Sequence, residues 1–385
     1  MVSGAGSGRP PVIPLARPVL GESEARALTE VLDSGWLVQG EQVRQFEGLL
    51  SARLDGVGCV ACSSGTAALQ LAIACLQLSP GSRIAVPAYT FAGPLNAVLL
   101  AGMEAVLVDV EPETFKIRAD SLLELLDEPK PPAALIIIHQ FGLPADLQPL
   151  LEPARTGGVA IIEDAACALG SHLQLNGKQV AAGTVGDLGC FSFHPRKLIT
   201  TGEGGAVVSR QQQLAERAAL LRNHGIVRDE QGLTSYAEAG WNFRLSELHA
   251  ALGVIQMDRL DGILRDRQDV AKRYLSALAP LQEFGLQLPQ VPDGRHGNWQ
   301  SFVVRVPDRL GAKAVAAKLR QRQIGSTPAA QALHLQPAYK NVECWGGSLD
   351  GAALCGRTGL ALPTPPQMSD QQIDQVTEAL QAILS

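Results

Sequence analysis

One lysine of the chain has a setting that suits covalent chemistry. Lys197 follows an alternating apolar run and a proline at residues 190–195, and a small, glycine-rich segment at residues 200–205 comes after it. These flanks hold the amine in place, and an amine in a partly desolvated pocket loses its proton readily enough to form a Schiff base with an aldehyde. Most lysines are exposed, so a surface lysine beside a turn is the alternative unless other residues support the chemistry.

Two carboxylates end a buried apolar strand that the sequence predicts at residues 159–164. Glu163 and Asp164 are neighbours, so their side chains point to opposite faces of the strand. We expect one of them to enter a site at the strand end and the other to pair outside it. The alternative for Asp164 is a helix cap before Ala165 and Ala166.

A turn of small residues lies between a predicted strand at residues 57–61 and a predicted apolar helix at residues 67–78. Backbone N–H groups at the start of a helix can hold a phosphate, and Gly65 and Thr66 lie at this point. The turn lacks the GxxxxGKS/T pattern of nucleotide-binding P-loops, and no GxGxxG follows a strand. A purely structural turn is the alternative.

A sheet must bring these residues together. Predicted strands and helices alternate along the chain, with strands at residues 83–86, 105–108 and 133–139 and helices at residues 89–100 and 119–126. Strands separated by helical crossovers indicate an α/β fold whose mostly parallel sheet is sandwiched by helices. Ligands of such sheets bind beyond the carboxyl ends of the strands, where Asp164 lies.

The sequence predicts two domains. A disordered lead-in is expected at residues 1–12, which are rich in Gly, Ser and Pro and are not followed by a long apolar run. A large domain at residues 13–250 carries the residues described above. A long helix with an apolar stripe, beginning near Ser246, is expected to link it to a smaller C-terminal α+β domain at residues 251–385.

The composition is that of a globular chain, with 385 residues of which 46% are hydrophobic and 18% are charged. The formal net charge is -6, from 32 basic and 38 acidic residues, which argues against nucleic acid or an acidic membrane surface as a partner. No apolar stretch approaches the roughly twenty residues that a membrane span needs.

Seven cysteines are scattered along the chain, with a single CxxC pair formed by Cys59 and Cys62. Because no second pair and no histidine cluster supply further ligands, we expect no metal site. Unpaired, reduced thiols predict a cytoplasmic protein.

Lys197, Asp164 and the turn at residues 63–66 together predict one cofactor. Pyridoxal 5′-phosphate (PLP) needs a lysine for its aldehyde, a carboxylate that keeps its pyridine nitrogen protonated, and donors for its phosphate. The order of the three features and their places at strand ends suit that set. We therefore expect the large domain to bind PLP.

The sequence around these residues resembles the DegT/DnrJ/EryC1/StrS family of PLP-dependent sugar aminotransferases, which have the aspartate-aminotransferase fold (fold type I). The similarity runs from about residue 14 to residue 365, and its most specific segment is residues 191–205, FSFHPRKLITTGEGG. Supporting motifs are SGTAAL at residues 64–69, PAYTF at 87–91, EDAA at 163–166, LRNHG at 221–225, NFRLSE at 242–247 and HLQPAY at 334–339.

The resemblance implies a role for each residue of these motifs. Lys197 would form the Schiff base and carry the proton between the cofactor carbon and the substrate carbon. Asp164 would pair with the pyridinium nitrogen through a charge-assisted hydrogen bond worth roughly 1.5–3 kcal/mol. Phe91 would stack on the cofactor ring, and core packing is the alternative for this side chain.

The resemblance also implies a phosphate site and a homodimer. Gly65, Thr66 and Ser192 would hold the phosphate, and Asn242 would reach it from the neighbouring subunit. The active sites of the dimer would then be shared. An Asn242 that caps its own loop is the alternative.

Three histidines are weaker candidates for binding substrate. His139, at the end of a predicted strand, resembles a family histidine near the sugar, and His194 and His334 are further candidates. A satisfied structural histidine is the alternative at each position. Cys167 departs from the family, which often has Gln, His or Glu after the EDAA motif. A thiol is a weak hydrogen-bonding group, so a contact to the ring oxygen of the cofactor does not carry over to it.

We therefore predict an enzyme, a PLP-dependent aminotransferase that transfers an amino group from an amino acid, most suitably glutamate, to a keto group of a nucleotide-linked sugar. The alternative within the family is a cyclic keto-polyol or another non-nucleotide substrate. The dehydratase branch of the family has histidine in place of the lysine, and Lys197 argues against it. A PLP-binding regulator without turnover is the non-enzyme alternative.

Overall fold

A large sheet organises the chain, whose residues 13–385 are described by the computed structural model. The predicted lead-in at residues 1–12 lies outside the described residues. Neighbouring strands pair in the order β1 (Gly58–Cys62), β10 (Gly205–Ser209), β9 (Leu188–Ser192), β6 (Ala160–Asp164), β5 (Ala134–Ile138), β2 (Arg83–Pro87), β4 (Glu104–Val108) and β17 (Glu343–Cys344). All pairs are parallel except those of β10, which is antiparallel to β1 and β9.

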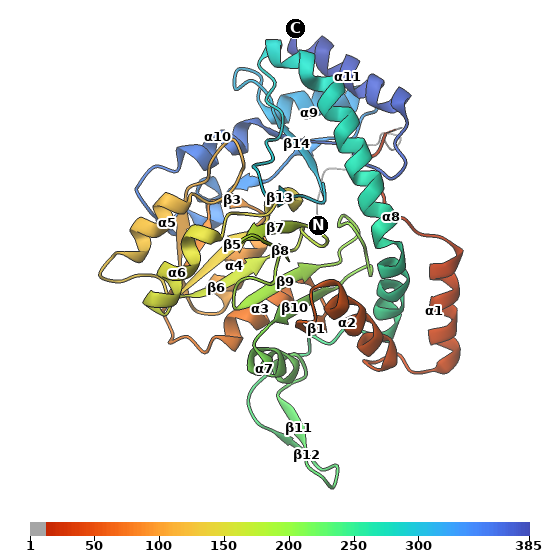
Figure 1. Cartoon of the computed structure of the whole chain (residues 1–385), viewed down its shortest axis with the longest axis vertical. Coiled ribbons are helices and arrows are strands. Elements are labelled where there is room, and N and C mark those ends of the chain that lie inside the picture. Colours follow the sequence, from red (N-terminus) through yellow and green to blue (C-terminus); the bar gives the residue numbers. More distant parts are fainter. Residues whose placement is uncertain (1–12) are drawn as a thin grey trace.

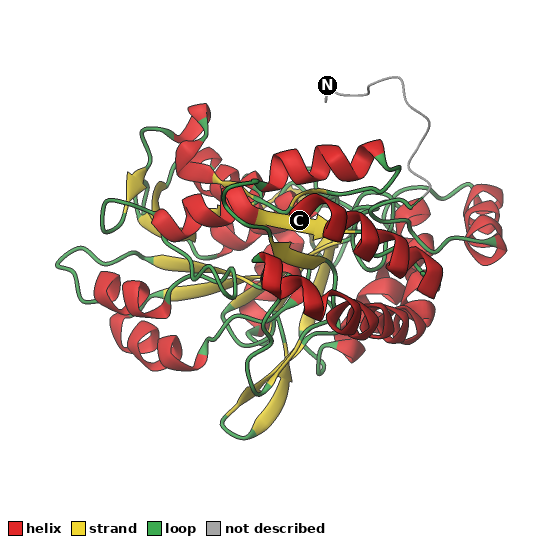
Figure 2. Ribbon diagram, turned by 90° about the horizontal axis from the view of Figure 1, so that it is seen from above, coloured by secondary structure: helices red, strands yellow, loops and turns green. Residues whose placement is uncertain are grey.

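Helices cover both faces of this sheet (Figure 2). The helices that pack on one face are α2 (Glu41–Arg53), α5 (Ala119–Leu126), α6 (Gln148–Gly157) and the first part of α8 (Glu247–Leu278). The helices that pack on the other face are α3 (Gly65–Cys75), α4 (Ala92–Leu100), α7 (Gln212–Arg222) and α10 (Asp350–Thr358). The prediction of an α/β fold with a mostly parallel sheet between layers of helices is confirmed.

Strand β5 shows why the sheet is buried on both faces. Its five residues are all apolar and all buried, with the sequence ALIII. Because side chains alternate along a strand, Leu135 and Ile137 join the cluster under α2 and α5, while Ile136 and Ile138 join the cluster under α3 and α4. A continuous apolar run is typical of a strand inside a parallel sheet.

The C-terminal part has a small sheet and a core of its own. Its strands are β14 (Phe302–Arg305), β18 (Gly359–Leu362) and β15 (Thr327–Pro328), and its helices include α9 (Ala312–Gln321) and α11 (Asp370–Leu384). The second part of α8 contributes Val270 and Tyr274 to this core, so the helix runs unbroken from one core to the other (Figure 1). The proposed boundary between residues 250 and 251 lies within α8 and stays a prediction.

Short strands complete the fold. They are β3 (Tyr89–Thr90) paired with β16 (Gln331–Ala332), β13 (Arg295–His296) paired with the hairpin of β7 (His172–Leu175) and β8 (Lys178–Ala181), and the hairpin of β11 (Ile226–Arg228) and β12 (Thr234–Tyr236). The β11–β12 hairpin projects from the body of the protein beyond α7 (Figure 1). Helix α1 (Glu22–Ser34) packs against α8.

Most predicted elements are present, with one informative exception. The helix predicted at residues 89–100 begins at Ala92, because Tyr89 and Thr90 form a strand with residues 331–332. The strand that residues 89–90 pair with lies far away in the sequence, so nothing in the residues around them predicts the pairing. In the described part of the chain, no helix is long and apolar enough to cross a membrane.

Candidate active site

The loop between β9 and β10 presents Lys197. The two strands form an antiparallel pair, and the loop that joins them closes on Phe193, whose N–H donates to the Gly204 carbonyl over 2.8 Å. The Phe193 carbonyl accepts from the Thr200 hydroxyl over 2.8 Å and from the Thr201 N–H over 3.0 Å. Phe193, Thr200 and Thr201 are buried, so the half-buried lysine is held on a fixed loop.

The amine of Lys197 points to the turn that follows β6. Its Nζ lies 3.2 Å from Cys167 Sγ. Asn298 fixes this turn, since its Nδ2 donates to the carbonyls of Cys167 and Leu169 over 2.8 and 2.9 Å. Gln300 fixes the lysine loop, since its Nε2 donates to the Arg196 carbonyl over 2.5 Å. The segment around residues 298–300 thus joins the two parts of the site.

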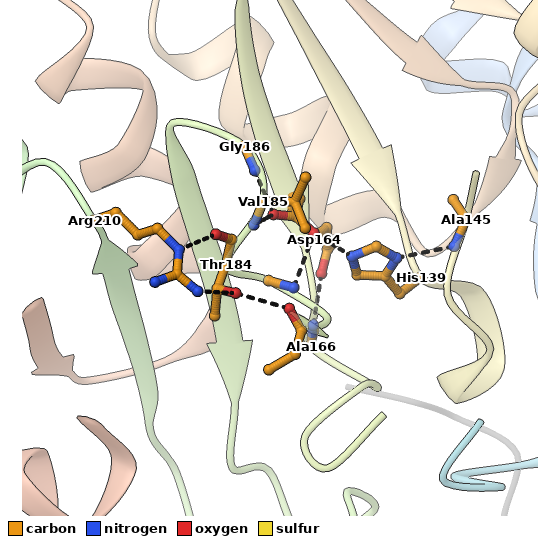
Figure 3. Close-up of polar contacts among 11 residues, drawn as sticks. His139, Ala145, Asp164, Ala166, Thr184, Val185, Gly186 and Arg210 are labelled. Carbon is orange, nitrogen blue, oxygen red and sulfur yellow. Dashed lines mark hydrogen bonds and ion pairs between the residues drawn. The ribbon is translucent and has the colours of Figure 1, made fainter. Parts of the chain in front are cut away.

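Asp164 ends strand β6 beside this lysine. Its carboxyl is buried, with 6% of the residue exposed, and Oδ1 accepts from the Ala166 N–H over 3.0 Å (Figure 3). A turn follows Asp164 and no helix begins there, so this hydrogen bond does not cap a helix, which was the predicted alternative. Burial raises the pKa of Asp164, although the Ala166 N–H and the charge of Lys197 act against it. Oδ2 accepts no hydrogen bond from any residue of the range 13–385 and is available to a ligand.

Glu163 faces the other side of β6, as the alternation of side chains predicts. Its carboxylate is fully buried and accepts from the backbone N–H groups of Gly183, Val185 and Gly186 over 2.9, 2.6 and 2.7 Å. Burial alone would raise the pKa of Glu163, but hydrogen bonds from His139, Gly186 and Gly183 together lower it. Glu163 therefore ties the end of β6 to the turn before β9.

His139 is the remaining partner of Glu163. Its Nε2 lies 2.7 Å from Glu163 Oε2, and its Nδ1 accepts from the Ala145 N–H over 3.0 Å (Figure 3). An Nδ1 that accepts leaves the proton on Nε2, which donates to the carboxylate. The side chain is 0% exposed and both ring nitrogens are used, which favours the structural alternative over contact with a substrate.

Small residues meet at the start of α3, on the ligand edge of the sheet. The Ser64 hydroxyl caps the helix by accepting from the Ala67 N–H over 3.1 Å. The N–H groups of Gly65 and Thr66, in the first turn, have no acceptor within the helix. A Cβ on Gly65 would lie 2.7 Å from Ser192 Cβ and 3.0 Å from Ser192 Oγ, so the helix start and the end of β9 are in close contact.

Gly205 makes a second close approach at this point. A Cβ on Gly205 would lie 2.3 Å from the Ser64 carbonyl oxygen and 2.7 Å from the Gly65 nitrogen. Only glycine therefore lets β10 pack against the start of α3. The lysine loop and the small-residue turn, far apart in the sequence, form one surface.

Phe91 directly precedes α4 on the same edge. Its side chain is 69% exposed in the single chain, so the alternative of core packing is disfavoured. A Cβ on Gly93 would contact both Phe91 Cδ1 at 3.3 Å and Thr66 Oγ1 at 3.6 Å, so the aromatic ring borders the small-residue turn. The structure thus gathers Lys197, Asp164, Thr66 and Phe91 around one sheet edge.

The other candidates are more peripheral. Asn242 is exposed, its side chain forms no hydrogen bond with the described residues, and it lies opposite Asn223 in an isolated bridge. His194 Nδ1 accepts from the Arg196 N–H over 3.2 Å, within the lysine loop. His334 follows β16, and its buried Nδ1 has no partner among residues 13–385. Burial lowers the pKa of His334, while Asp109 and Asp350 act in the opposite direction.

Sequence reasoning did not find Asn298 and Gln300. Each acts through an amide that bonds to a backbone carbonyl of another segment, and no motif marks such a contact in a sequence. Among residues 13–385, no group of three or more His, Cys, Asp or Glu side chains is arranged to hold a metal ion.

Comparison with known proteins decides which chemistry this arrangement serves. The sequence profile of the DegT/DnrJ/EryC1/StrS aminotransferase family matches residues 18–381. The chain belongs to this family. It is therefore an enzyme and an aminotransferase, as the motifs around Lys197 predicted.

Members of the family with similar sequences cover nearly the whole chain. The GDP-perosamine synthase of Caulobacter vibrioides is 33% identical over 377 residues, which are 97% of this chain and 99% of that protein. The solved structure of the aminotransferase TlmJ from Streptoalloteichus hindustanus is 33% identical, with a TM-score of 0.88, over 97% of this chain and 99% of that one. The structure of DesV from S. venezuelae in complex with a ketimine intermediate is 32% identical, with a TM-score of 0.83, over 94% of each chain.

Proposed function

We propose that this aminotransferase uses PLP to move an amino group from an amino acid, most suitably glutamate, to a keto group of a nucleotide-linked sugar. The observation that supports it best is the arrangement at one sheet edge of the Lys197 amine, the buried Asp164 carboxylate and the small-residue turn at Gly65. The relative named GDP-perosamine synthase, 33% identical over nearly the full length, supports a nucleotide-linked sugar.

The residues fit PLP in three respects. The Lys197 amine is held on a fixed loop, Asp164 Oδ2 is free for a ring N–H, and the N–H groups of Gly65 and Thr66 lie beside the Ser192 hydroxyl. PLP supplies an electrophilic carbon and an electron-withdrawing ring when bound. The carboxylate at Asp164 would keep the ring nitrogen protonated, and the helix start would hold the phosphate.

The side chains around the ring have distinct tasks in this proposal. Lys197 binds the cofactor and, once substrate replaces it, carries the proton between two carbon atoms. Phe91 packs against one face of the ring and excludes water from it. Thr66 and Ser192 orient the phosphate, so that the ring and the amine keep one relative position.

We also propose a homodimer whose partner subunit supplies Asn242. The exposed position of Asn242 and the projecting β11–β12 hairpin, with Leu233 69% and Tyr236 70% exposed, support an intersubunit contact. Light scattering would measure the mass. Coexpression of Lys197→Ala and Asn242→Ala chains should restore some activity, because one of the two shared sites would then be intact. A monomer with full activity would contradict this proposal.

The seven cysteines are all free in the fold, which supports a reducing compartment such as the cytoplasm. The activity is tested by incubating the purified enzyme with glutamate and a panel of nucleotide-linked keto sugars and measuring 2-oxoglutarate. Release of 2-oxoglutarate that depends on one of these sugars is expected. Release that occurs only with a cyclic keto-polyol would favour that substrate class. PLP bound without any half-reaction on glutamate would contradict glutamate as the amino donor.

A further inference from the structure

Two buried amides, those of Asn298 and Gln300, lie between the C-terminal part of the chain and the loop that carries Lys197. The two residues are 4% and 6% exposed, and both belong to the segment that leads into β14. Their hydrogen bonds connect the backbone of Lys197 with the residue that its amine contacts. This arrangement concerns the position of the lysine side chain itself, beyond the two loops that the amides hold.

Gln300 anchors the peptide group from which the lysine side chain starts. Its Nε2 donates to the Arg196 carbonyl over 2.5 Å, which is the C=O of the peptide group between Arg196 and Lys197. The N–H of the same peptide group donates to the His194 carbonyl over 2.8 Å. Because the peptide group is planar and is bonded on both sides, its orientation is fixed. The direction in which the lysine side chain leaves the backbone is restricted as a result.

Asn298 anchors the residue at the other end of the lysine side chain. Its Nδ2 donates to the carbonyls of Cys167 and Leu169, and its Oδ1 accepts from the Gln300 N–H over 2.8 Å. The Cys167 thiol in turn lies 3.2 Å from Lys197 Nζ. The contacts therefore form a closed chain, from the Lys197 backbone through the two amides and the thiol to the Lys197 amine. Both ends of the side chain are positioned by one short segment.

The amide of Asn298 lies in a site that fits it closely. A Cβ on Gly142, whose φ is 91°, would lie 1.9 Å from Asn298 Oδ1 and 3.0 Å from the Cys167 carbonyl oxygen. The Ser171 hydroxyl accepts from the Asn298 N–H over 3.1 Å and donates to the Gly142 carbonyl over 2.7 Å. Asn298 is thus held by its backbone as well as by its side chain, and it can serve as a fixed reference for the lysine.

Packing alone does not account for the residues of this segment. Gln300 Oε1 is buried and has no hydrogen-bond partner among residues 13–385, which costs stability that a methionine of similar size would not lose. Trp299, between the two amides, has a φ of 54°, in a region that bulky residues avoid. Its ring stacks on Phe302 in the C-terminal core, with centroids 5.7 Å apart. Unfavourable features of this kind gather at functional sites.

We propose that Gln300 and Asn298 are positioning residues for the Lys197 amine, and that they act on the reactions of this amine and not on the binding of the amino donor. The inference rests on the proposed role of Lys197. When Lys197 binds PLP, its nitrogen bonds to the aldehyde carbon, and the aldehyde oxygen leaves as water with the two amine protons. A misplacement of about 1 Å can lower the rate of such a step about a hundredfold.

Gln300→Met tests the hydrogen bond to the Arg196 carbonyl, because methionine has a similar size and no donor. PLP is added to the PLP-free protein, borohydride stops the reaction at set times, and peptide mapping measures reduced cofactor on Lys197. We expect the link to form at least tenfold more slowly than in the parent protein. Gln375→Met, at an exposed position of α11, is the matched control and should react as the parent does. Urea unfolding shows whether each protein is folded.

The outcomes separate this inference from the proposed function. If the parent protein forms no link at Lys197, the proposed function itself is wrong. If the parent and Gln300→Met form the link equally fast, Gln300 does not position the amine. With glutamate as donor, Gln300→Met should lower kcat at least tenfold and change KM less than about twofold. A loss that appears in KM alone would also overturn the proposal.

Gln300→Glu distinguishes the hydrogen bond from packing and serves if Gln300→Met does not fold. Only a protonated carboxyl can donate to the Arg196 carbonyl, and burial favours that form. The rate of link formation relative to the parent should therefore rise at least threefold as the pH falls from about 8 to about 5. The corresponding ratio for Gln300→Met should stay constant. A ratio for Gln300→Glu that does not depend on pH would overturn the proposal.

Asn298→Ala tests whether the two amides act together. It should slow the formation of the link at Lys197, since the turn at Cys167 loses its anchor. The Asn298→Ala/Gln300→Met protein should be slowed by less than the product of the two single effects, because both amides belong to one chain of contacts. Effects that multiply exactly would show that the amides act independently, and the proposed closed chain would be wrong.

Discussion

The Lys197 amine lies 3.2 Å from the Cys167 thiol, and the two residues come from loops after neighbouring parallel strands, β9 and β6. Each loop is held by an amide from the segment at residues 298–300. The position of the amine is thus set by packing between the sheet and the segment that leads into β14. The proposed roles of Lys197 and of the residues around it in binding PLP can be tested by substitution and chemical labelling.

Replacement of Lys197 by alanine should remove the covalent link to PLP. Borohydride treatment followed by peptide mapping should find reduced cofactor on Lys197 of the parent enzyme and on no lysine of the variant. Amino transfer should fall by several orders of magnitude, since covalent catalysis is lost. Lys178→Ala is the control, because Lys178 is exposed on β8. A reduced adduct on another lysine of the Lys197→Ala protein would show that the assignment is wrong.

Cofactor binding should protect Cys167 from alkylation. The thiol is half-buried and next to the amine, so a bound ring at Lys197 would block access to it. Iodoacetamide should therefore label Cys167 faster in the PLP-free protein than in the loaded protein. Cys344 is also half-buried, and burial followed by the charge of Glu343 raises its pKa, so its slow alkylation should not depend on PLP. Equal rates at Cys167 in both forms would argue against a cofactor at this position.

Gly65→Ala should weaken PLP binding without unfolding the protein. The new Cβ would lie 2.7 Å from Ser192 Cβ and would force the helix start away from β9. Overpacking of this kind costs about 1–3 kcal/mol, which corresponds to roughly fivefold to 150-fold in PLP affinity if the displacement falls on the phosphate site. Titration of PLP followed by absorbance measures the change.

Gly48→Ala is the matched control for this substitution. Gly48 is exposed in the middle of α2, and a Cβ there would meet nothing within 4 Å. It should leave PLP affinity unchanged and stabilise the helix by roughly 0.5–1 kcal/mol. If both variants bind PLP as the parent does, the start of α3 does not hold the phosphate.

Much of this site could be predicted because its signals are local. A strand that ends in Glu163 and Asp164, a small-residue turn before an apolar helix, and a lysine between a proline and glycines can each be recognised within a few residues of sequence. The period-two alternation along β6 also predicts that the two carboxylates face opposite ways, and their hydrogen bonds confirm it. The predicted boundaries of α5, residues 119–126, match the structure for the same reason.

The rest depends on contacts between distant segments. Asn298 and Gln300 bond to backbone carbonyls more than a hundred residues earlier in the chain, and residues 89–90 are a strand only because residues 331–332 pair with them. Left-handed φ angles at Phe115 and Trp299 contradict local preference and are held by packing. The conformational preferences of neighbouring residues do not encode these long-range contacts.

Asp164→Asn should lower PLP affinity and raise the stability of the cofactor-free protein. The amide can still accept from the Ala166 N–H, but it cannot form a charge-assisted hydrogen bond, which is worth about 1.5–3 kcal/mol, or roughly tenfold to a hundredfold in Kd. Equilibrium titration with PLP measures this loss. An unchanged Kd would remove Asp164 from the proposed site.

The stability effect has a definite sign. Burial raises the pKa of Asp164 above its ordinary 3.8, so the folded state favours the protonated carboxyl. The contribution of protonated Asp164 to the free energy of unfolding is complete below pH 3.8 and is lost as the pH rises through the pKa of the folded state. In urea unfolding without PLP, Asp164→Asn should therefore be more stable than the parent protein at neutral pH, and the difference should shrink as the pH falls toward 4.

Glu163→Gln should have the opposite effect on stability, although it lies next to Asp164 in the sequence. An amide cannot accept from His139 and from three backbone N–H groups at once, so at least one buried donor would lose its partner. The expected loss in the free energy of unfolding is about 3 kcal/mol. Glu152→Gln is the control, since Glu152 is exposed on α6 and should leave stability unchanged.

The pH dependence separates Glu163 from Asp164. Although burial opposes it, hydrogen bonds from His139 and from backbone N–H groups lower the pKa of Glu163 below its ordinary 4.5. Its contribution is therefore present above pH 4.5 and is lost as the pH falls through the folded pKa. The parent protein should lose this stability on acidification, and Glu163→Gln should lose less over the same range. If the two proteins lose equal stability between neutral and acid pH, Glu163 is not ionised in the folded state, and the turn at residues 183–186 is held by other contacts.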